Sequence, residues 1–348
     1  MSVQSKVKPP NRNFQNAKAS KQDEFYTQLS DIEKELRHYT AHFRGKTVLC
    51  NCDDPRVSNF FHYFSFNFEK LNLKKLITTC YRNQQSDLFS RNESERGIRL
   101  EYNGNKKGGR VPNPTEIGIH ELKGDGDFRS EECVALLKRA DVVVTNPPFS
   151  LFREYVEQLM KQNKNFLIIG NQNAITYKEV FKLIQQNRIW LGASIHSGDR
   201  EFGVPKHYPL KAAGFRVDGE GNKFIRVKGV RWFTNMDYSE RHDDLTLFKT
   251  YSPEQYPTYA NFDAIEVAKT ADVPVEYDGA MGVPITFLDK YNPDQFEILG
   301  SSMTLGKPMS TVAQKGTYSQ GGPRFYISNG DGTYRRMYDR LIIKNKRL

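Results

Sequence analysis

The sequence predicts an α/β fold: a mostly parallel sheet with an antiparallel hairpin at one edge, followed by a smaller mixed domain at the carboxyl end. Three observations predict it. Apolar, β-branched runs alternate with segments of helical periodicity up to about residue 235. Asp218-Gly219-Glu220-Gly221-Asn222 separates two strand-like runs, as a hairpin turn does. From about residue 236 this rhythm stops, and tyrosines alternate with prolines.

The composition is that of a globular protein with a polyanionic partner. A chain of 348 residues is long enough for one large domain and a smaller one. The net charge of +10 and the pI of about 9.2 suit a polyanion. The sequence has no apolar run of membrane-spanning length and no secretory signal. The four cysteines have neither zinc-ligand nor disulfide spacing, which favours a reducing, cytosolic setting. We expect three of them in buried strands and one in a helix.

The first element is a basic arm over residues 1–22, which has five cations, no acid and almost no apolar residue. This composition predicts disorder, and the arm either follows a phosphate backbone or is a solvated tail. Apolar residues then recur at intervals of three and four, and Ser30-Asp31-Ile32-Glu33 has the form of a capping box. We therefore predict a helix over 30–43, with Phe25-Tyr26-Thr27 as its entry.

Two strands follow, and each ends in polar residues. The first, from Lys46, ends at Asp53-Asp54 before a helix that starts near Val57. The glycine-rich loop usual at this turn is missing. Asp53 and Asp54 therefore either bind a cationic or hydroxyl-bearing ligand or cap the helix. The second strand, Leu76–Tyr81, ends with an aromatic side chain where dinucleotide-binding folds often place an acid.

Residues 82–123 are polar and irregular, with strand-like pieces at 98–102 and 116–122. We predict a hairpin insertion at about 95–123 with a basic tip at Lys106-Lys107, which either contacts phosphates or is solvated. Gly124-Asp125-Gly126-Asp127-Phe128 closes this section at the expected end of a third strand. An acid beside an aromatic residue there can bond and cover an adenine ring.

The sheet is organised around the stretch 141–150. Three consecutive valines predict a strand buried on both faces, and 151–160 has apolar residues at helical spacing. Asn146-Pro147-Pro148-Phe149 therefore lies on a turn at the carboxyl end of a central strand, where open α/β sheets place ligands.

The residue types of this turn suit one kind of chemistry. Proline restricts its own φ and keeps the preceding residue extended, so the carbonyl groups have few orientations. The side-chain oxygen of Asn146 and the carbonyl of Pro147 can accept both hydrogens of an exocyclic amino group, which directs its lone pair towards an electrophile. Phe149 offers a flat face for stacking an extruded base. The plain alternative is an ordinary strand, turn and helix stopped by prolines.

Further elements complete the chain. We predict a strand at 165–170, a helix around 180–184 and a hairpin formed by 213–217 and 224–233. In the carboxyl-terminal region we predict strands at 282–288, 295–299 and 340–343. A cluster of arginines and lysines between Lys315 and Arg347 predicts a surface that faces nucleic acid.

Four stretches carry a resemblance to a known family. They are Asp23-Glu24-Phe25-Tyr26-Thr27-Gln28, Cys50-Asn51-Cys52-Asp53-Asp54-Pro55, Asn146-Pro147-Pro148-Phe149 and Gly282-Val283-Pro284-Ile285-Thr286-Phe287-Leu288-Asp289-Lys290-Tyr291-Asn292-Pro293. With them the chain resembles the S-adenosylmethionine-dependent N6-adenine DNA methyltransferases, and among these the EcoRI-type modification enzymes. The resemblance covers essentially everything after the basic arm, in the motif order called the γ class.

The resemblance implies a Rossmann-like methyltransferase sheet, with a catalytic domain over 23–235 and a DNA target-recognition region over 236–348. It implies that an extruded adenine is held by a catalytic turn of four residues, Asn146, Pro147, Pro148 and Phe149. It also implies that S-adenosylmethionine is held by residues of several segments, and that no metal takes part. These cofactor residues are Phe25, Tyr26, Thr27, Cys52, Asp53, Cys80, Tyr81, Asp127, Phe128 and Asn146.

The resemblance further implies a duplex DNA substrate, a monomer, no membrane, and a bacterial or phage-encoded enzyme of the cytoplasm. A cognate restriction endonuclease that forms no stable complex with it, and a short palindromic site such as GAATTC, fit the same family. Two other functions stay open on the sequence: methylation of RNA adenine or of a protein glutamine, and a catalytically inactive nucleic-acid-binding protein with this fold.

Overall fold

The computed structural model describes residues 26–52, 54–81, 96–104, 112–196, 199–204, 214–320 and 322–348. The basic arm, Phe25, Asp53 and the Lys106-Lys107 tip lie outside these ranges. The chain divides into two compact units, Met1–Ala174 with Ser197–Met236 and Ile175–His196 with Asp237–Leu348. The sequence predicts 175–196 within the first domain, whereas the structure groups this segment with the second unit. Hydrogen bonds connect this segment with the second unit, because Gln185 Nε2 donates to Leu299 O (2.7 Å) and the Tyr238 hydroxyl donates to Leu191 O (3.1 Å).

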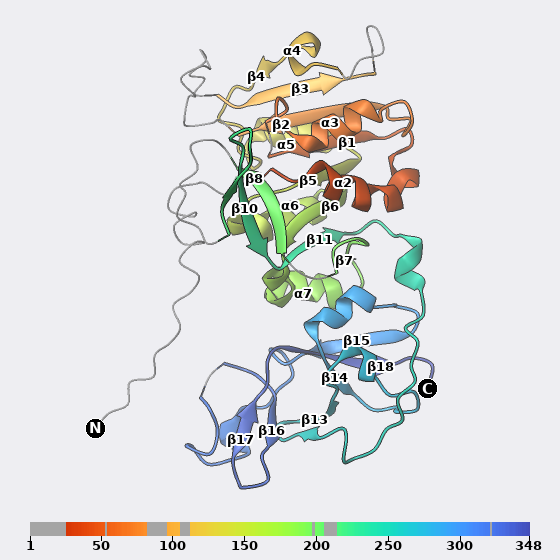
Figure 1. The fold of residues 1–348 in the computed structure, drawn as a ribbon, viewed down its shortest axis with the longest axis vertical. Helices are drawn as coiled ribbons and strands as arrows, with labels where there is room; N and C mark the ends of the chain where they lie inside the picture. The colour runs from red at the N-terminus through yellow and green to blue at the C-terminus, as the bar shows by residue number, and fades with distance from the viewer. Residues whose placement is uncertain are drawn as a thin grey trace, which may run out of the picture. The chain divides into compact units, whose positions relative to one another are not determined.

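The first unit is built on a mixed sheet whose strand order begins β4-β3-β2-β1-β5-β6-β11 (Figure 1). Its four central strands are parallel, as predicted. They are β2 (Lys75–Cys80), β1 (Thr47–Asn51), β5 (Val142–Thr145) and β6 (Asn165–Asn171). The further strands that this unit contributes to the sheet are β3 (Ile98–Tyr102), β4 (His120–Glu121) and β11 (Val230–Thr234), of which β3 and β11 run antiparallel to their central neighbours.

Helices cover both faces of this sheet. Trp232 and Phe233 are consecutive in β11, so their side chains point to opposite faces. Trp232 packs edge-on against Phe60, at a centroid distance of 6.2 Å, and Phe233 packs against Phe152 at 5.0 Å. Phe60 and Phe152 belong to different helices, which therefore lie on opposite faces. The helices of this unit are α2 (Leu29–Leu36), η1 (Arg37–Phe43), α3 (Asn59–Phe66), α4 (Pro114–Ile117), α5 (Glu131–Arg139), η2 (Phe149–Leu151) and α6 (Phe152–Lys161).

Two sequence-based expectations about strands differ from the structure. The expected third strand ending near 124–127 is wrong, because β3 runs antiparallel to β2 and pairs with β4 as the hairpin at the sheet edge. The predicted hairpin over 213–233 is divided between two sheets. Its first part joins a separate small sheet, whose strands are β8 (Asp199–Val204), β9 (Arg216–Val217) and β10 (Lys223–Lys228). Gly229, with φ of +67°, breaks the run, so that β11 enters the main sheet beside β6.

The second unit is a small mixed domain. Its five-stranded sheet has the order β12-β13-β14-β18-β15, in which only β13 and β14 pair in parallel. These strands are β12 (Thr258–Tyr259), β13 (Phe262–Glu266), β14 (Met281–Pro284), β15 (Phe296–Ser301) and β18 (Arg340–Asn345). A two-stranded sheet of β16 (Tyr326–Ser328) and β17 (Tyr334–Arg336) is separate from it. The unit also contains α7 (Lys178–Gln185), η3 from Ile175 onward (Gln172–Thr176), β7 (Trp190–Leu191), η4 (Ser239–His242), η5 (Thr270–Asp272), η6 (Ile285–Lys290) and η7 (Met309–Thr311).

The core of the second unit contains a buried ion pair, Arg340 with Glu266, and the ring of Tyr259 packs beside it. Arg340 donates two hydrogen bonds to Glu266 Oε1, from Nε (3.0 Å) and Nη2 (2.7 Å), and both residues are buried. The Tyr259 hydroxyl donates to the other carboxylate oxygen of Glu266. A Cβ at Gly282 would lie 2.6 Å from the Tyr259 ring, so only glycine fits beneath it. This explains the glycine that opens the Gly282–Pro293 stretch. No helix in the described part of either unit is both long enough and apolar enough to span a bilayer.

His242 joins two acidic segments of the second unit. Its Nδ1 lies 2.7 Å from Asp294 Oδ2, and its Nε2 lies 2.9 Å from Asp237 Oδ2. The hydrogen bond with Asp294, followed by that with Asp237, raises the pKa of His242 above its ordinary value. Protonated His242 therefore holds the start of the unit, after Met236, against the turn that precedes β15.

This arrangement predicts a pH-dependent contribution to stability. The pKa of His242 is higher in the folded state than in the unfolded chain, so its stabilising contribution is complete below about pH 6.5 and disappears as the pH rises through the raised value. We expect His242→Gln to lower the urea midpoint at pH 5.5 and to leave it unchanged at pH 9. Urea denaturation of both proteins at both pH values measures this difference. An equal deficit at both pH values would show that His242 acts by packing alone.

Candidate functional site

The Asn146-Pro147-Pro148-Phe149 turn lies where the sequence predicts it, directly after β5 and before η2 and α6. All four residues of β5 are buried, and the strand is paired with β1 on one side and β6 on the other. Asn146 is 6% exposed, and Pro148 is extended, with φ of −54° and ψ of 125°. The turn is thus attached to a strand that is buried over its whole length, with little freedom at its backbone.

A buried asparagine on the neighbouring strand fastens this turn. The Thr145 hydroxyl donates to the backbone oxygen of Asn51, the last residue of β1, and the Tyr155 hydroxyl of α6 donates to the Asn51 side-chain oxygen. Tyr155 is fully buried, and this burial raises the pKa of its hydroxyl well above the ordinary value, so it remains a neutral donor. The sequence does not predict a role for Asn51, and it indicates Tyr155 only as an apolar helix position. The available signal is an amide side chain at the end of the buried strand Thr47–Asn51.

Beyond β1 the chain adopts an uncommon conformation. Cys52 has φ of +92°, a region that residues with a side chain rarely occupy. Its N–H donates to Thr79 O of β2 (3.0 Å). Cys52 therefore follows the strand, and the expectation of three strand cysteines is wrong for this one; Cys50 and Cys80 lie in β1 and β2, and Cys133 in α5. All four are free thiols.

Asp54, which follows β1, does not cap the next helix, α3. The N-cap of α3 is Ser58, whose hydroxyl accepts from Phe61 N (3.4 Å), so Asp54 is not the cap. Instead the Asp54 carboxylate accepts from Arg56 Nε at 2.9 Å. This hydrogen bond raises the pKa of Arg56, with smaller contributions from the nearby Cys80 and Tyr26.

The segment before α2 is held at the same edge of the sheet. Tyr26 pairs with Gly203 of β8 through two backbone hydrogen bonds of 2.8 and 2.9 Å. Asn59 Nδ2, at the start of α3, donates to Thr27 O (2.7 Å). The Thr27 side chain is 2% exposed, and its hydroxyl has no hydrogen-bond partner among the described residues. A buried hydroxyl with this property is suited to a ligand that supplies the missing bond.

The predicted adenine-contacting residues are brought against the end of β2. A Cβ on Gly126 would collide with the Cys80 carbonyl and lie 3.1 Å from Tyr81 Cα, and Gly126 has φ of +83°. The loop therefore touches β2 backbone to backbone, which places Asp127 and Phe128 next to Tyr81.

Hydrogen bonds and ring contacts fix both side chains of this pair. The Asp127 carboxylate accepts from Arg129 Nε (2.9 Å) and Nη2 (2.7 Å). Phe128 is 7% exposed and packs edge-on against Tyr155 at 5.0 Å. Through Tyr155 the loop is connected with Asn51 and the Asn146 turn.

These contacts bring together residues of the segments expected to hold a cofactor, at the carboxyl ends of β1 and β2: Tyr26 and Thr27, Cys52 and Asp54, and Cys80 and Tyr81 with the loop 126–128. Three features fit a ligand that contacts the backbone as well as side chains. They are the Thr27 hydroxyl without a hydrogen-bond partner among the described residues, the close backbone approach at Gly126 and the positive φ of Cys52. The residues present thus fit a nucleoside-type cofactor, and the adjacent β5 presents the Asn146 turn towards the same edge.

Comparison with known proteins gives one family. The family model described as "Adenine-specific methyltransferase EcoRI" matches residues 13–346. The chain is 48% identical over 340 residues to the Type II methyltransferase M.EcoRI of Escherichia coli, which covers 97% of the chain and 98% of that relative. It is 36% identical over 346 residues to M.MgeORF184P of Mycoplasma genitalium (96% and 99% covered) and 35% identical over 343 residues to M.MpnI of Mycoplasma pneumoniae (96% and 98% covered), both Type II methyltransferases.

No solved structure matches the chain significantly. The matching model spans nearly the whole sequence and the relatives are covered almost completely, so both units are shared with them. This chain belongs to the EcoRI family of adenine-specific methyltransferases.

Proposed function

We propose that the enzyme transfers a methyl group from S-adenosylmethionine to N6 of an adenine that it extrudes from duplex DNA. The observation that carries this proposal is the Asn146-Pro147-Pro148-Phe149 turn at the carboxyl end of β5, beside the segments at the ends of β1 and β2. The enclosure of this turn supports the extrusion of the adenine, because a base inside a duplex would not reach it.

Asn146 and Pro147 position the target amine. Their two oxygens, one from a side chain and one from the backbone, accept the two hydrogens of N6 and keep its lone pair directed towards the methyl donor. The Asn51 hydrogen bonds to Thr145 and Tyr155 fix the base of the turn, so little reorganisation is needed when the amine enters. Phe149 flanks the turn with 6% exposure, and its ring stacks on the adenine once neighbouring side chains make room.

The cofactor is assigned to residues of the segments described above. Tyr26, Thr27 and Cys52, with Phe25 and Asp53 outside the described ranges, would hold its methionine part. Cys80, Tyr81, Asp127 and Phe128 would hold its ribose and adenine, and Asn146 would border the transferred group. When bound, S-adenosylmethionine supplies an electrophilic methyl group.

The close approach at Gly126 gives a test of the cofactor assignment. Gly126→Ala places a Cβ against the Cys80 carbonyl at a positive φ, which costs roughly 1–2 kcal/mol for the conformation alone. We expect the loop to shift and S-adenosylmethionine to bind at least about tenfold more weakly, since 1.4 kcal/mol is tenfold. Isothermal titration calorimetry measures this. The matched control is Gly124→Ala, where the added Cβ has no atom within 4 Å. Equal affinity of the two variants for S-adenosylmethionine would show that Asp127 and Phe128 do not belong to the cofactor site.

Duplex DNA is the acceptor that the charge of the chain favours. The net charge of +10 and the cluster of lysines and arginines between Lys315 and Arg347 suit a phosphate backbone better than a protein glutamine. The printed names of the relatives, Type II methyltransferases, agree with a site-specific modification enzyme of a restriction-modification system or an orphan relative. On this proposal the protein is a monomer that acts in the bacterial cytoplasm, with or without a cognate endonuclease.

The deciding experiment offers duplex DNA, RNA and protein to the purified enzyme in competition, with methyl-labelled S-adenosylmethionine, and then maps modified adenines in a mixed DNA library. We expect the label in duplex DNA, at N6 of adenine, in one short sequence; GAATTC is the first site to test. Label in RNA or protein alone would overturn the proposal, and no label in any acceptor would favour an inactive binding protein.

A further inference from the structure

The hairpin of β16 and β17 is the isolated two-stranded sheet of the second unit (Figure 1). Tyr326 pairs with Arg336, Ile327 with Arg335 and Ser328 with Tyr334. Its turn is held internally, because the Asp331 carboxylate accepts from Thr333 N (2.9 Å) and from the Thr333 hydroxyl (2.6 Å). The hairpin is thus a stiff two-stranded ribbon, an element that the major groove of B-DNA is wide enough to admit.

The two faces of this ribbon differ. Paired residues share a face and successive residues alternate, so Ile327 and Arg335 lie on one face. Ile327 is 4% exposed and belongs to the core cluster with Phe325, which makes this the inner face. The other face carries Ser328, Tyr334 and Arg336, and near its base Tyr326 is covered edge-on by Tyr318. The outer face therefore presents the guanidinium group of Arg336 opposite Tyr326 and the hydroxyl groups of Ser328 and Tyr334 towards the turn, the types that read base edges.

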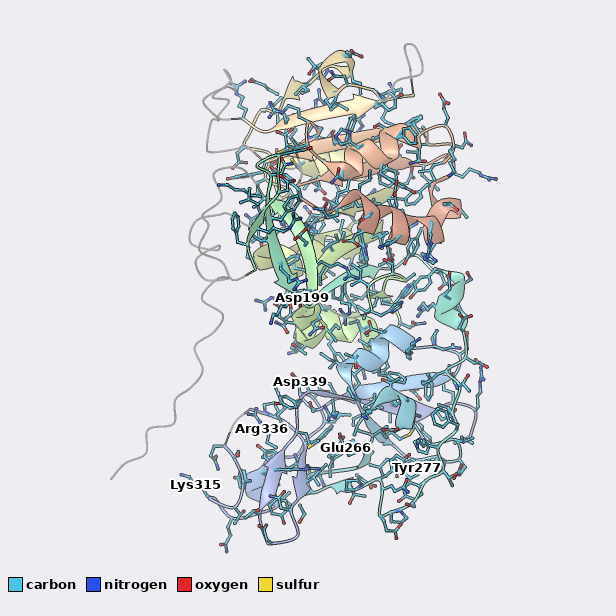
Figure 2. All side chains as sticks on the ribbon, in the orientation of Figure 1. Asp199, Glu266, Tyr277, Lys315, Arg336 and Asp339 are labelled. Atoms are coloured by element: carbon cyan, nitrogen blue, oxygen red, sulfur yellow. The ribbon has the colours of Figure 1, made fainter. Side chains whose placement is uncertain are left out.

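The ribbon also concentrates unpaired positive charge. Between residues 302 and 338 the sequence has five cations (Lys307, Lys315, Arg324, Arg335 and Arg336) and one acid, Asp331, which is used within the turn. Among the described residues, Arg335 and Arg336 are exposed and have no ion-pair partner. Other arginines of the unit, Arg241, Arg324, Arg340 and Arg347, are paired with acids. Figure 2 shows Lys315 and Arg336 at the outer margin of this unit, in the region of the hairpin.

An exposed aromatic ring adjoins the free arginines. Tyr338, two residues after β17, is 87% exposed and makes no hydrogen bond through its hydroxyl to any described residue. A ring with both faces in solvent contributes nothing to the core, whereas against a nucleic acid it can stack on a base or cover a sugar.

We propose that the outer face of the β16–β17 hairpin enters the major groove of the DNA, where Arg336 reads a guanine edge and Arg335 binds a backbone phosphate. This inference rests on the proposed action on duplex DNA. Arg336 lies on the outer face with two fixed donors that match O6 and N7 of guanine. Arg335 shares the face of Ile327 but is itself exposed, so it is assigned to a backbone phosphate and not to a base edge.

The test compares three single variants of the full-length enzyme, Arg336→Ala, Arg335→Ala and Arg188→Ala. Arg188 is the matched control, since it is exposed and without an ion-pair partner among the described residues but lies between α7 and β7, away from the hairpin in sequence and sheet. For each variant, kcat/KM is measured on the mapped duplex and on duplexes with one base pair changed, at several salt concentrations. Thermal unfolding and S-adenosylmethionine affinity report on folding.

We expect Arg336→Ala to lower discrimination at one guanine-containing position by at least about fivefold. Arg335→Ala should weaken all duplexes alike and reduce the slope of log K against log salt by about 1. Arg188→Ala should behave as the wild type. Unchanged discrimination with Arg336→Ala, or losses equalled by Arg188→Ala, would overturn the inference. A wild-type enzyme that fails to methylate duplex DNA would instead refute the proposed function, and this is seen before any variant is compared.

Discussion

Asn146→Ala is expected to reduce methyl transfer by at least roughly 10²–10³-fold while DNA and S-adenosylmethionine still bind. The substitution removes one of the two acceptors that hold the amine, and the backbone acceptor at Pro147 alone cannot fix its orientation. Single-turnover rates with saturating substrates measure the chemical step, and equilibrium titrations measure binding. A parallel loss of binding and rate would show that Asn146 only supports the turn.

The matched control is Asn235→Ala. Asn235 is half-buried and directly follows β11, beside the amino end of β6. There its side-chain oxygen accepts from Phe166 N (2.8 Å) and its Nδ2 donates to Lys164 O (2.9 Å). Losing these bonds should cost about 1–3 kcal/mol of stability without a change in the rate of the folded enzyme. A rate loss as large as that of Asn146→Ala would mean that general weakening of the sheet, not the position of the amine, controls the rate.

Arg340→Ala is expected to destabilise the second unit by about 3–5 kcal/mol, because it leaves the Glu266 carboxylate buried without its partner. Glu266 is 5% exposed, and its remaining contact, the Tyr259 hydroxyl, cannot neutralise a charge. Chemical denaturation measures the free energy of unfolding, and we expect the loss to appear mainly in this unit's transition.

Burial, and not geometry, produces this effect. Arg347 pairs with Asp244 at the same N–O distance of 2.7 Å as Arg340 with Glu266, but both partners of the former pair are about half exposed. Arg347→Ala should therefore cost less than about 1 kcal/mol. Similar losses of stability for Arg340→Ala and Arg347→Ala would contradict this explanation. It would also be contradicted if the double variant Arg340→Met with Glu266→Leu were no more stable than Arg340→Ala.

The sequence predicts the elements whose pattern is local. The valines of β5, the prolines that end it and the apolar spacing of α6 place the catalytic turn without further information. The helix predicted over 30–43 is present but changes from α2 to the 3₁₀ helix η1 at Arg37. In the second unit, β14, β15 and β18 lie where strands are predicted, although the expected strand at 282–288 becomes η6 from Ile285. The short strands β12, β13, β16 and β17 are not predicted.

What the sequence does not reveal depends on partners distant in the chain. The direction of β3 is set by the strand beside it, and a run such as Ile98–Tyr102 reads the same in either direction. The run 223–234 is divided after Lys228, because β10 pairs with β8 in the small sheet and β11 pairs with β6 in the main sheet, and this choice depends on which sheet has a free edge. The links from Asn51 to Thr145 and Tyr155 span 94 and 104 residues, and no local pattern announces them.

The shared asparagine at the end of β1 has a thermodynamic consequence. On the proposed function, Asn51 belongs to the strand that leads into the turn assigned to the methyl donor, and its two oxygens are bonded to the strand and helix that flank the turn assigned to the methyl acceptor. Order imposed on one turn by its ligand therefore lowers the entropic cost of filling the other. By reciprocity, donor and acceptor should enhance each other's affinity by the same factor, whichever arrives first.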